Sequence, residues 1–135
     1  MQKEPLVLML EEDPDDRQLT ESALLELGFD IPVTYVSDSD ELFDHLKHRQ
    51  RPALIMLDYN STPAPALEIL KALKASDEYR SIPAVVLGEG LPAVYVRQCY
   101  DHGASSYITK PASVRGTREK IAGFFRYWLN VAETT

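Results

Sequence analysis

The segment ALIMLDYN, residues 53–60, decides the fold because it joins a run of apolar residues directly to a carboxylate. Residues 54–57 are all apolar, which is typical of a strand that is buried on both faces of a parallel sheet. Asp58 follows this run with no intervening turn residue. A buried strand that ends on a carboxylate raises the question of what that carboxylate does.

Four further short apolar runs also predict strands, at residues 6–10, 33–36, 84–87 and 106–109. Segments with helical spacing separate the strands, and Asp13 followed by Pro14 predicts an N-cap and the first residue of a helix. Five alternating strand–helix units predict an α/β fold of the flavodoxin-like type. This is a doubly wound, five-stranded parallel sheet with strand order 2-1-3-4-5 and helices on both faces.

Composition limits the class of protein. The chain of 135 residues suits a single domain that spans residues 1–135, with no output domain. A net charge of −7 argues against a nucleic-acid partner, and no apolar run is long enough to cross a membrane. The single cysteine, Cys99, cannot form an intrachain disulfide, which favours a cytoplasmic location.

Charged residues stand at the ends of the predicted strands, where ligands bind in this architecture. Glu12 and Asp13 follow the first strand, Asp58 the third and Lys110 the fifth. Three neighbouring carboxylates raise one another's pKa unless a cation neutralises them, and oxygen ligands suit Mg²⁺. Because a lysine suits a phosphate, these residues predict a phosphoryl-transfer site with Asp58 as nucleophile. The next acidic pair, Asp15–Asp16, is interpreted as first-turn charge that favours the helix dipole.

Four segments of the chain resemble the receiver domain of two-component response regulators: VLMLEEDPDD (7–16), PALIMLDYN (52–60), IPAVVL (82–87) and GASSYITKP (103–111). They follow the family's order, and the resemblance extends over essentially the whole chain. The stretches DDRQLTESAL and FFRYWL are similar to stand-alone receivers that are paired with bacterial phytochrome-type histidine kinases. The resemblance implies a phosphorylation-controlled switch in a phosphorelay, not a metabolic enzyme.

The resemblance also implies a role for each matching residue. Asp58 is expected to accept a phosphoryl group from a sensor histidine kinase or phosphotransfer protein, and Lys110 is expected to pair with that group. The Lys110–Pro111 peptide bond is expected to be cis and to hold the lysine in place. Mg²⁺ is expected to be held by the carboxylates of Asp13 and Asp58, the backbone carbonyl of Asn60, and Glu12 through a water.

Several positions depart from the family's pattern and affect the switch. Gly88 stands where the family has Ser or Thr, whose hydroxyl couples the phosphate to an aromatic residue of the fifth strand. That aromatic residue, Tyr107, is present without its partner, and Glu89 brings a charge that opposes a phosphate. The loop STPAPA (61–66) predicts a rigid, reshaped connection after the acceptor. Phosphorylation is therefore expected, but with an altered response.

Two other functions remain open. The glycine at position 88 and the charge at position 89 are compatible with a degenerate receiver that binds proteins without phosphorylation. The residues Asp58–Thr62 also resemble the DxDxT motif of haloacid-dehalogenase phosphatases, a class of true hydrolases. Against the second alternative, Asn60 replaces the general acid of that motif, and the chain lacks room for a cap domain.

Val114, Ile121, Phe125, Trp128 and Leu129 mark a final helix, in which residues 124–129 are rich in aromatic side chains. One stripe has to cover the sheet, and the remaining aromatic residues are either buried as well or form an exposed partner surface. Receivers of the resembled group dimerise through the fourth and fifth helices and the fifth strand. A homodimer is therefore expected, with output through a downstream protein target or onward relay of the phosphoryl group.

Overall fold

The structure is a computed structural model and describes residues 6–28, 31–111 and 113–130. Within these ranges the strands are β1 (Val7–Leu10), β2 (Val33–Val36), β3 (Leu54–Asp58), β4 (Ala84–Gly88) and β5 (Ser106–Thr109). The helices are α1 (Pro14–Leu27), α2 (Ser39–His48), α3 (Ala66–Ala75), α4 (Ala93–Asp101) and α5 (Val114–Asn130). The strands pair in parallel in the order β2-β1-β3-β4-β5. The predicted flavodoxin-like fold is confirmed.

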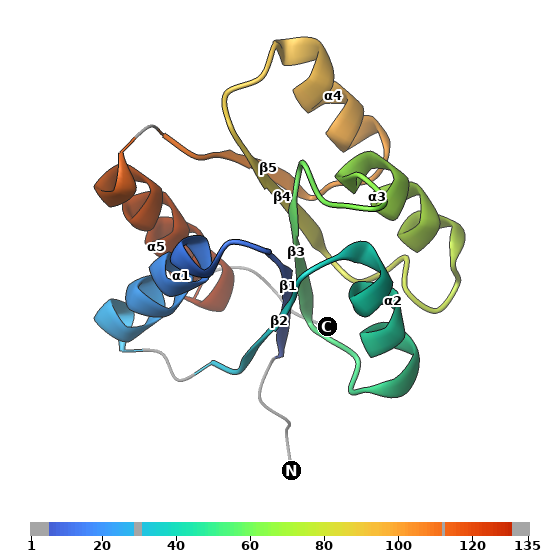
Figure 1. Ribbon diagram of the computed structural model, residues 1–135, viewed down its shortest axis with the longest axis horizontal. Coiled ribbons are helices and arrows are strands. Elements are labelled where there is room, and N and C mark those ends of the chain that lie inside the picture. Colours follow the sequence, from blue (N-terminus) through green and yellow to red (C-terminus); the bar gives the residue numbers. More distant parts are fainter. Residues whose placement is uncertain (1–5, 29–30, 112, 131–135) are drawn as a thin grey trace.

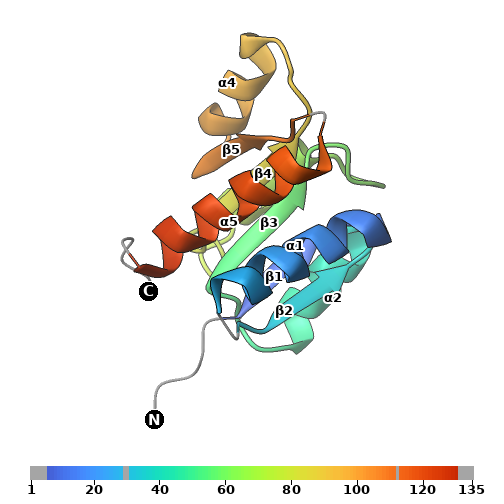
Figure 2. The ribbon, with the colours of Figure 1, turned by 90° about the vertical axis from the view of Figure 1, so that its left-hand side faces the viewer.

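Helices cover both faces of the sheet (Figure 1). α1 and α5 lie on one face, and α2, α3 and α4 lie on the other. Figure 2 shows α1 and α5 side by side along their face of the sheet. Side chains alternate along the central strands, so Leu57 belongs to the core under α2 and α3 while Met56 belongs to the core under α1 and α5. Burial on both faces explains the unbroken apolar runs of β1 and β3.

The strand register brings the carboxyl ends of the central strands to one level. Leu10 of β1 lies beside Leu57 of β3, and Leu87 of β4 lies beside Asp58. Glu11, the residue after β1, therefore comes level with Asp58. The loops that leave β1, β3, β4 and β5 open at this same edge of the sheet, because the strands are parallel.

The caps of α1 follow the predicted chemistry. Asp13 is the N-cap, and its Oδ1 accepts the backbone N–H of Asp15 at 2.9 Å. Pro14 occupies the first helical position, where its missing N–H costs nothing. Gly28 ends the helix with a φ of 74°, a conformation that suits glycine, and its N–H donates to the carbonyl of Leu25. The predicted start of the helix is confirmed.

The aromatic residues of α5 divide between the core and the surface. Phe125 and Trp128 are buried against the sheet, and Phe124 packs edge-on against Phe125 with ring centroids 5.5 Å apart. Tyr127 is 57% exposed. The helix thus has both a covered stripe and an exposed aromatic residue. The side chain of Leu129 lies outside the described residues.

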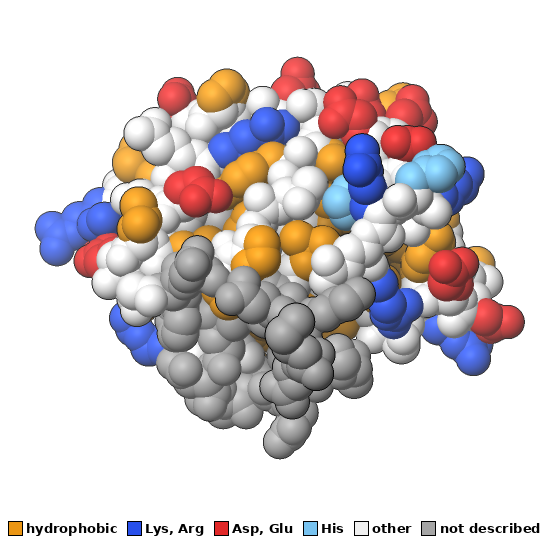
Figure 3. Space-filling model, turned by 90° about the horizontal axis from the view of Figure 1, so that it is seen from below, with side chains coloured by type: hydrophobic (Ala, Val, Ile, Leu, Met, Phe, Trp, Pro, Cys, Tyr) orange, Lys and Arg blue, Asp and Glu red, His pale blue; other side chains and the backbone are white. Residues whose placement is uncertain are grey.

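Charges of both signs are distributed over the face of the molecule shown in Figure 3, interspersed with apolar side chains. A nucleic-acid surface needs Lys and Arg gathered on one side, and the described part of this face has no such grouping. None of the described helices combines the length and the apolar character that a membrane span requires.

Replacement of Phe125 with Ala is expected to destabilise the fold by about 3 to 5 kcal/mol, because the ring is fully buried between α5 and the sheet. Chemical denaturation followed by circular dichroism measures this difference. Tyr127→Ala is the matched control on the exposed side of the same helix, with an expected change of about 0.5 kcal/mol or less. Equal losses in the two variants would contradict the described packing of α5.

Candidate functional site

A cavity of about 940 Å³ opens at the carboxyl edge of the sheet. Eight of the nine residues predicted for the site contribute to its lining: Glu12, Asp13, Asp58, Asn60, Gly88, Glu89, Lys110 and Pro111. Tyr107, the ninth, packs against Gly88 behind this wall. Two acidic residues that the sequence prediction left out, Glu11 and Asp16, line the cavity as well.

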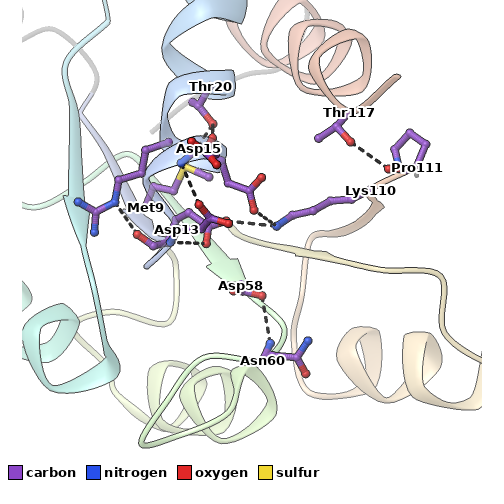
Figure 4. Close-up of polar contacts among 12 residues, drawn as sticks. Met9, Asp13, Asp15, Thr20, Asp58, Asn60, Lys110, Pro111 and Thr117 are labelled. Atoms are coloured by element: carbon purple, nitrogen blue, oxygen red, sulfur yellow. Dashed lines mark hydrogen bonds and ion pairs between the residues drawn. The ribbon is translucent and has the colours of Figure 1, made fainter. Parts of the chain in front are cut away.

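Asp58 is the last residue of β3, and its side chain is held by the turn that follows. Its Oδ1 accepts the backbone N–H of Asn60 at 3.1 Å (Figure 4). Its backbone carbonyl accepts the N–H of Ser61 at 3.1 Å. The N–H of Tyr59 donates to the carbonyl of Leu87 at 2.8 Å, which extends the sheet one residue beyond the acceptor. The carboxylate is therefore attached to a fixed strand end and not to a free loop.

The loop after Asp58 is anchored to the start of α2. Ser39 donates its N–H to the carbonyl of Thr62 at 2.9 Å, and its Oγ accepts the N–H of Ala64 at 3.0 Å. Ser61 donates its hydroxyl to the carbonyl of Ala64 at 2.8 Å, and both serines are buried. These bonds hold the proline-rich segment in a defined conformation beside the cavity.

Lys110 follows β5 and reaches toward α1 (Figure 4). Its ammonium forms ion pairs with Glu11 Oε1 at 3.2 Å and Asp16 Oδ2 at 3.1 Å. Among the described residues these are its acidic partners within 4 Å, and Asp58 is not one of them. Burial alone lowers the pKa of Lys110, but the charges and hydrogen bonds of Glu11 and Asp16 outweigh it, so the pKa of the ammonium is raised.

Glu11 is the most enclosed acid of the site, with a side chain only 3% exposed. Burial raises its pKa and the charge of Asp58 raises it further, while Lys110 acts in the opposite direction. Its Oε2 also accepts the N–H of Asp13 at 3.3 Å, and its backbone carbonyl accepts the Nε–H of Arg17. A sequence signal for Glu11 existed, because both central strands consist of four apolar residues followed by an acid.

Asp16 had no comparable sequence signal. It lies in the first turn of α1, where an acid is explained by the helix dipole alone. Its pairing with Lys110 spans 94 residues of sequence and depends on α1 and the end of β5 meeting at the cavity.

The family of the chain follows from comparison with known proteins. A model of the response regulator receiver domain matches residues 7–122. The chain belongs to the response regulator receiver domain family. This receiver is 27% identical, over 94% of its length and 86% of the relative's, to a probable methanogenesis regulatory protein, FilR2, of Methanothrix harundinacea. It is 25% identical to the rice two-component response regulator ORR5 over 79% of this chain and 78% of that protein.

Solved receiver structures superpose on the whole chain. The phosphorylated cyanobacterial phytochrome response regulator RcpA has a TM-score of 0.90 and 26% identity, over 98% of this chain and 99% of RcpA. The Mn²⁺-bound form of the response regulator Rcp1 also has a TM-score of 0.90, with 23% identity over 97% and 99% of the two chains. At 23% identity, the similarity to Rcp1 shows a shared fold. The resemblance to stand-alone receivers of the phytochrome type is confirmed by these neighbours.

The donor set of this receiver's cavity suits a hard cation, although its carboxylates are not gathered into a metal cluster. Among the described residues, no three His, Cys, Asp or Glu side chains are close enough together to hold a metal ion. Glu11 is paired with Lys110, and Asp13 Oδ1 caps α1. The charged residues of the lining are nevertheless six carboxylates and one lysine, and carboxylate oxygens are the ligands that Mg²⁺ prefers. The chemistry of the cavity thus fits a divalent cation.

The expected cis bond before Pro111 is wrong. Among the described residues, the cis peptide bond is Thr62–Pro63, and Lys110–Pro111 is trans. The backbone of Lys110 is fixed in another way, because its N–H donates to the carbonyl of Gly88 at 2.7 Å. Pro111 also accepts a hydrogen bond through its own carbonyl, from the hydroxyl of Thr117 in α5 at 3.2 Å.

Tyr107 occupies the space that a side chain at position 88 would need. A Cβ placed on Gly88 would lie 2.3 Å from the Tyr107 hydroxyl oxygen. The hydroxyl donates to the backbone carbonyl of Glu89 at 2.8 Å, and the ring meets Tyr59 edge-on at 6.3 Å. Burial raises the pKa of Tyr107 to about 12, with smaller contributions from neighbouring groups that include Cys99 and Tyr59. The missing hydroxyl at position 88 is thus accompanied by an inward-packed tyrosine.

Gly88→Ala is expected to displace the Tyr107 ring, since the new methyl and the phenol oxygen cannot occupy the same space. The pKa of Tyr107 should then fall from about 12 toward its ordinary value of 10.0, because burial is the main cause of the shift. A pH titration of the tyrosine ring signals by NMR measures this change. Gly90→Ala is the control, because its added Cβ meets only Thr109 at 3.9 Å. An unchanged Tyr107 pKa in Gly88→Ala would contradict the close packing.

Proposed function

We propose that this receiver accepts a phosphoryl group on Asp58 from a sensor histidine kinase or phosphotransfer protein and signals by protein–protein interaction or onward relay. The supporting observation is the placement of Asp58, at a buried strand end that opens into a cavity shared with Lys110 and the acidic residues after β1. Membership of the receiver domain family supports this proposal.

The transfer is an in-line displacement at phosphorus. Asn60 engages Oδ1 of Asp58, so we assign Oδ2 as the attacking atom. The new bond joins this oxygen to phosphorus, while the P–N bond of a phosphohistidine breaks. The electron pair of that bond passes to the leaving imidazole nitrogen, which takes up a proton. The product is an aspartyl phosphate, a covalent intermediate of the kind carboxylate nucleophiles form.

Mg²⁺ is the cofactor that the cavity lining favours. We assign its ligands to Glu12, Asp13 and Asp58 together with the backbone carbonyl of Asn60, as the resemblance implies. Glu11 joins this group in our proposal, because it is level with Asp58 and lines the same cavity. When bound, the ion neutralises charge on the carboxylates and on the phosphoryl oxygens. The free oxygen of Asp13 remains open to a cation, since only its Oδ1 caps the helix.

Lys110 provides the positive charge for the phosphoryl group. Its raised pKa keeps the ammonium protonated at neutral pH. The ammonium has three N–H donors, of which Glu11 and Asp16 engage two. We propose that the ammonium turns one of its donors toward an oxygen of the phosphoryl group on Asp58, as the resemblance implies for this lysine.

A Mg²⁺-dependent phosphoryl adduct is expected on wild-type protein after incubation with acetyl phosphate and is expected to be absent from Asp58→Asn. Intact-mass spectrometry detects the adduct directly. Asp77→Asn, an exposed acid on the connection after α3, is the matched control and should be phosphorylated like wild type. No adduct on folded wild-type protein in the presence of Mg²⁺ would overturn the proposal and favour the phosphorylation-independent binding module.

We also propose that the receiver forms a homodimer through α4, α5 and β5. Val94, Tyr95 and Tyr100 of α4 and Tyr127 of α5 are large apolar residues exposed on these helices. Exposed apolar patches favour partner surfaces, and receivers of the resembled group dimerise through these elements. Tyr100 also links α4 to β5, because its hydroxyl accepts the backbone N–H of Tyr107 at 3.0 Å.

Tyr95→Glu is expected to weaken this dimer, because it places a charge among apolar residues of the proposed interface. Light scattering at micromolar concentration, with and without a phosphate mimic, measures the molar mass. Leu25→Glu is the matched control: Leu25 is 78% exposed but belongs to α1, outside the proposed interface. A monomeric wild-type protein under both conditions would rule out the dimer.

A further inference from the structure

Two carboxylates from different elements hold the ammonium of Lys110. Glu11 comes from the end of β1 and Asp16 from the first turn of α1. The two N–O distances are nearly equal, at 3.2 and 3.1 Å. The side chain of Lys110 is 16% exposed, so the ammonium depends on these partners for much of its solvation. The three side chains form a partly buried triad with one positive and two negative charges.

The free-energy cost of separating Lys110 from Glu11 differs from the cost of separating it from Asp16. The side chain of Glu11 is 3% exposed, whereas that of Asp16 is 30% exposed. A buried carboxylate that loses its cation has no water to replace it, so separating Glu11 from Lys110 is expensive. Asp16 can be solvated when the ammonium moves away. The contact with Asp16 is therefore the one that can be exchanged.

A phosphoryl group on Asp58 would favour this exchange. It adds negative charge to a cavity that already contains six carboxylates among its described lining residues, with Lys110 as the one ammonium. Lys110 has no ion pair with Asp58 in the structure, although both line the cavity. An ammonium that turns toward the new oxygens moves away from the carboxylate in α1 that it can most easily leave.

We propose that Asp16 is a positioning residue that holds Lys110 toward α1 in the unphosphorylated protein and gives it up to the phosphoryl group on Asp58. This role rests on the proposed function of Asp58. The contact stabilises the unmodified state more than the phosphorylated one. Asp16 therefore lowers the affinity of the site for a phosphoryl group, and by linkage it sets the balance between the two states.

The matched pair for testing this role is Asp16→Asn and Asp15→Asn. Both remove one negative charge from the first turn of α1, and both therefore weaken the favourable helix dipole in the same way. Of these two residues, Asp16 contacts Lys110, whereas the side chain of Asp15 is exposed and its backbone N–H donates to Asp13 Oδ1. A difference between the two variants thus reports the place of Asp16 in the cavity beside Lys110, and not the general field of the helix.

The experiment is calorimetric titration of the full chain with beryllium fluoride in the presence of Mg²⁺, since this complex mimics a phosphoryl group on a carboxylate. Asp16→Asn is expected to bind about five- to tenfold tighter than wild type, the order of one partly screened ion pair, and Asp15→Asn less than twofold tighter. Asp16→Glu, which keeps the charge, is expected to restore binding toward the wild-type value. Circular dichroism checks that all variants are folded.

The ¹⁵N signal of the Lys110 ammonium provides a second readout that needs no phosphoryl mimic. Asp16→Asn should shift this signal and speed its proton exchange with water, and Asp15→Asn should not. Equal binding by Asp16→Asn and Asp15→Asn, or weaker binding by Asp16→Asn, overturns the role of Asp16 while leaving Asp58 as acceptor. Absence of binding by every variant overturns the proposed function itself, and this role with it.

Discussion

Charge crowding at the carboxyl edge of the sheet is the constraint on which the rest of the site depends. The parallel register places Glu11 level with Asp58, and the start of α1 adds further acids to the same cavity. Like charges in a partly buried space disfavour one another's ionised form. Lys110 relieves part of this repulsion by pairing with Glu11, the most buried acid of the site, and with Asp16 of α1. The remaining carboxylates account for the affinity for a cation that we propose.

Space at the end of β4 is the second constraint. With Gly88 at this position, the Tyr107 ring can lie against the backbone and donate its hydroxyl to the carbonyl of Glu89. A larger residue would compete for the same volume, so the identity of residue 88 and the inward position of the ring are one structural feature. The departure from the family's Ser or Thr thus removes a side-chain hydroxyl and at the same time gives the tyrosine a backbone partner.

The sequence predicted the fold because its signals are local and strong. The unbroken apolar runs of β1 and β3 require burial on both faces, and Asp13 with Pro14 marks the start of α1 by cap chemistry alone. The site was predicted less completely. Asp58 and Lys110 were singled out from strand ends, but Glu11 was left out of the acids after β1, because three consecutive acidic residues give no periodicity to choose among them. The pairing of β1 with β3 places Glu11 level with Asp58 and so shows which of these acids comes first in the site.

The contacts that the sequence did not predict join residues that lie far apart along the chain. Asp16 has a sufficient local explanation in the helix dipole, and its contact with Lys110 exists only after α1 and β5 have both been placed. The same holds for the main-chain link between Lys110 and Gly88, whose carbonyl accepts the lysine N–H. The carbonyls of Gly88 and Glu89 accept hydrogen bonds from the Lys110 backbone N–H and the Tyr107 hydroxyl, so the backbone of Lys110 and the Tyr107 ring are attached to adjacent peptide groups. A displacement of this short segment is therefore expected to move both the backbone of Lys110 and the Tyr107 ring.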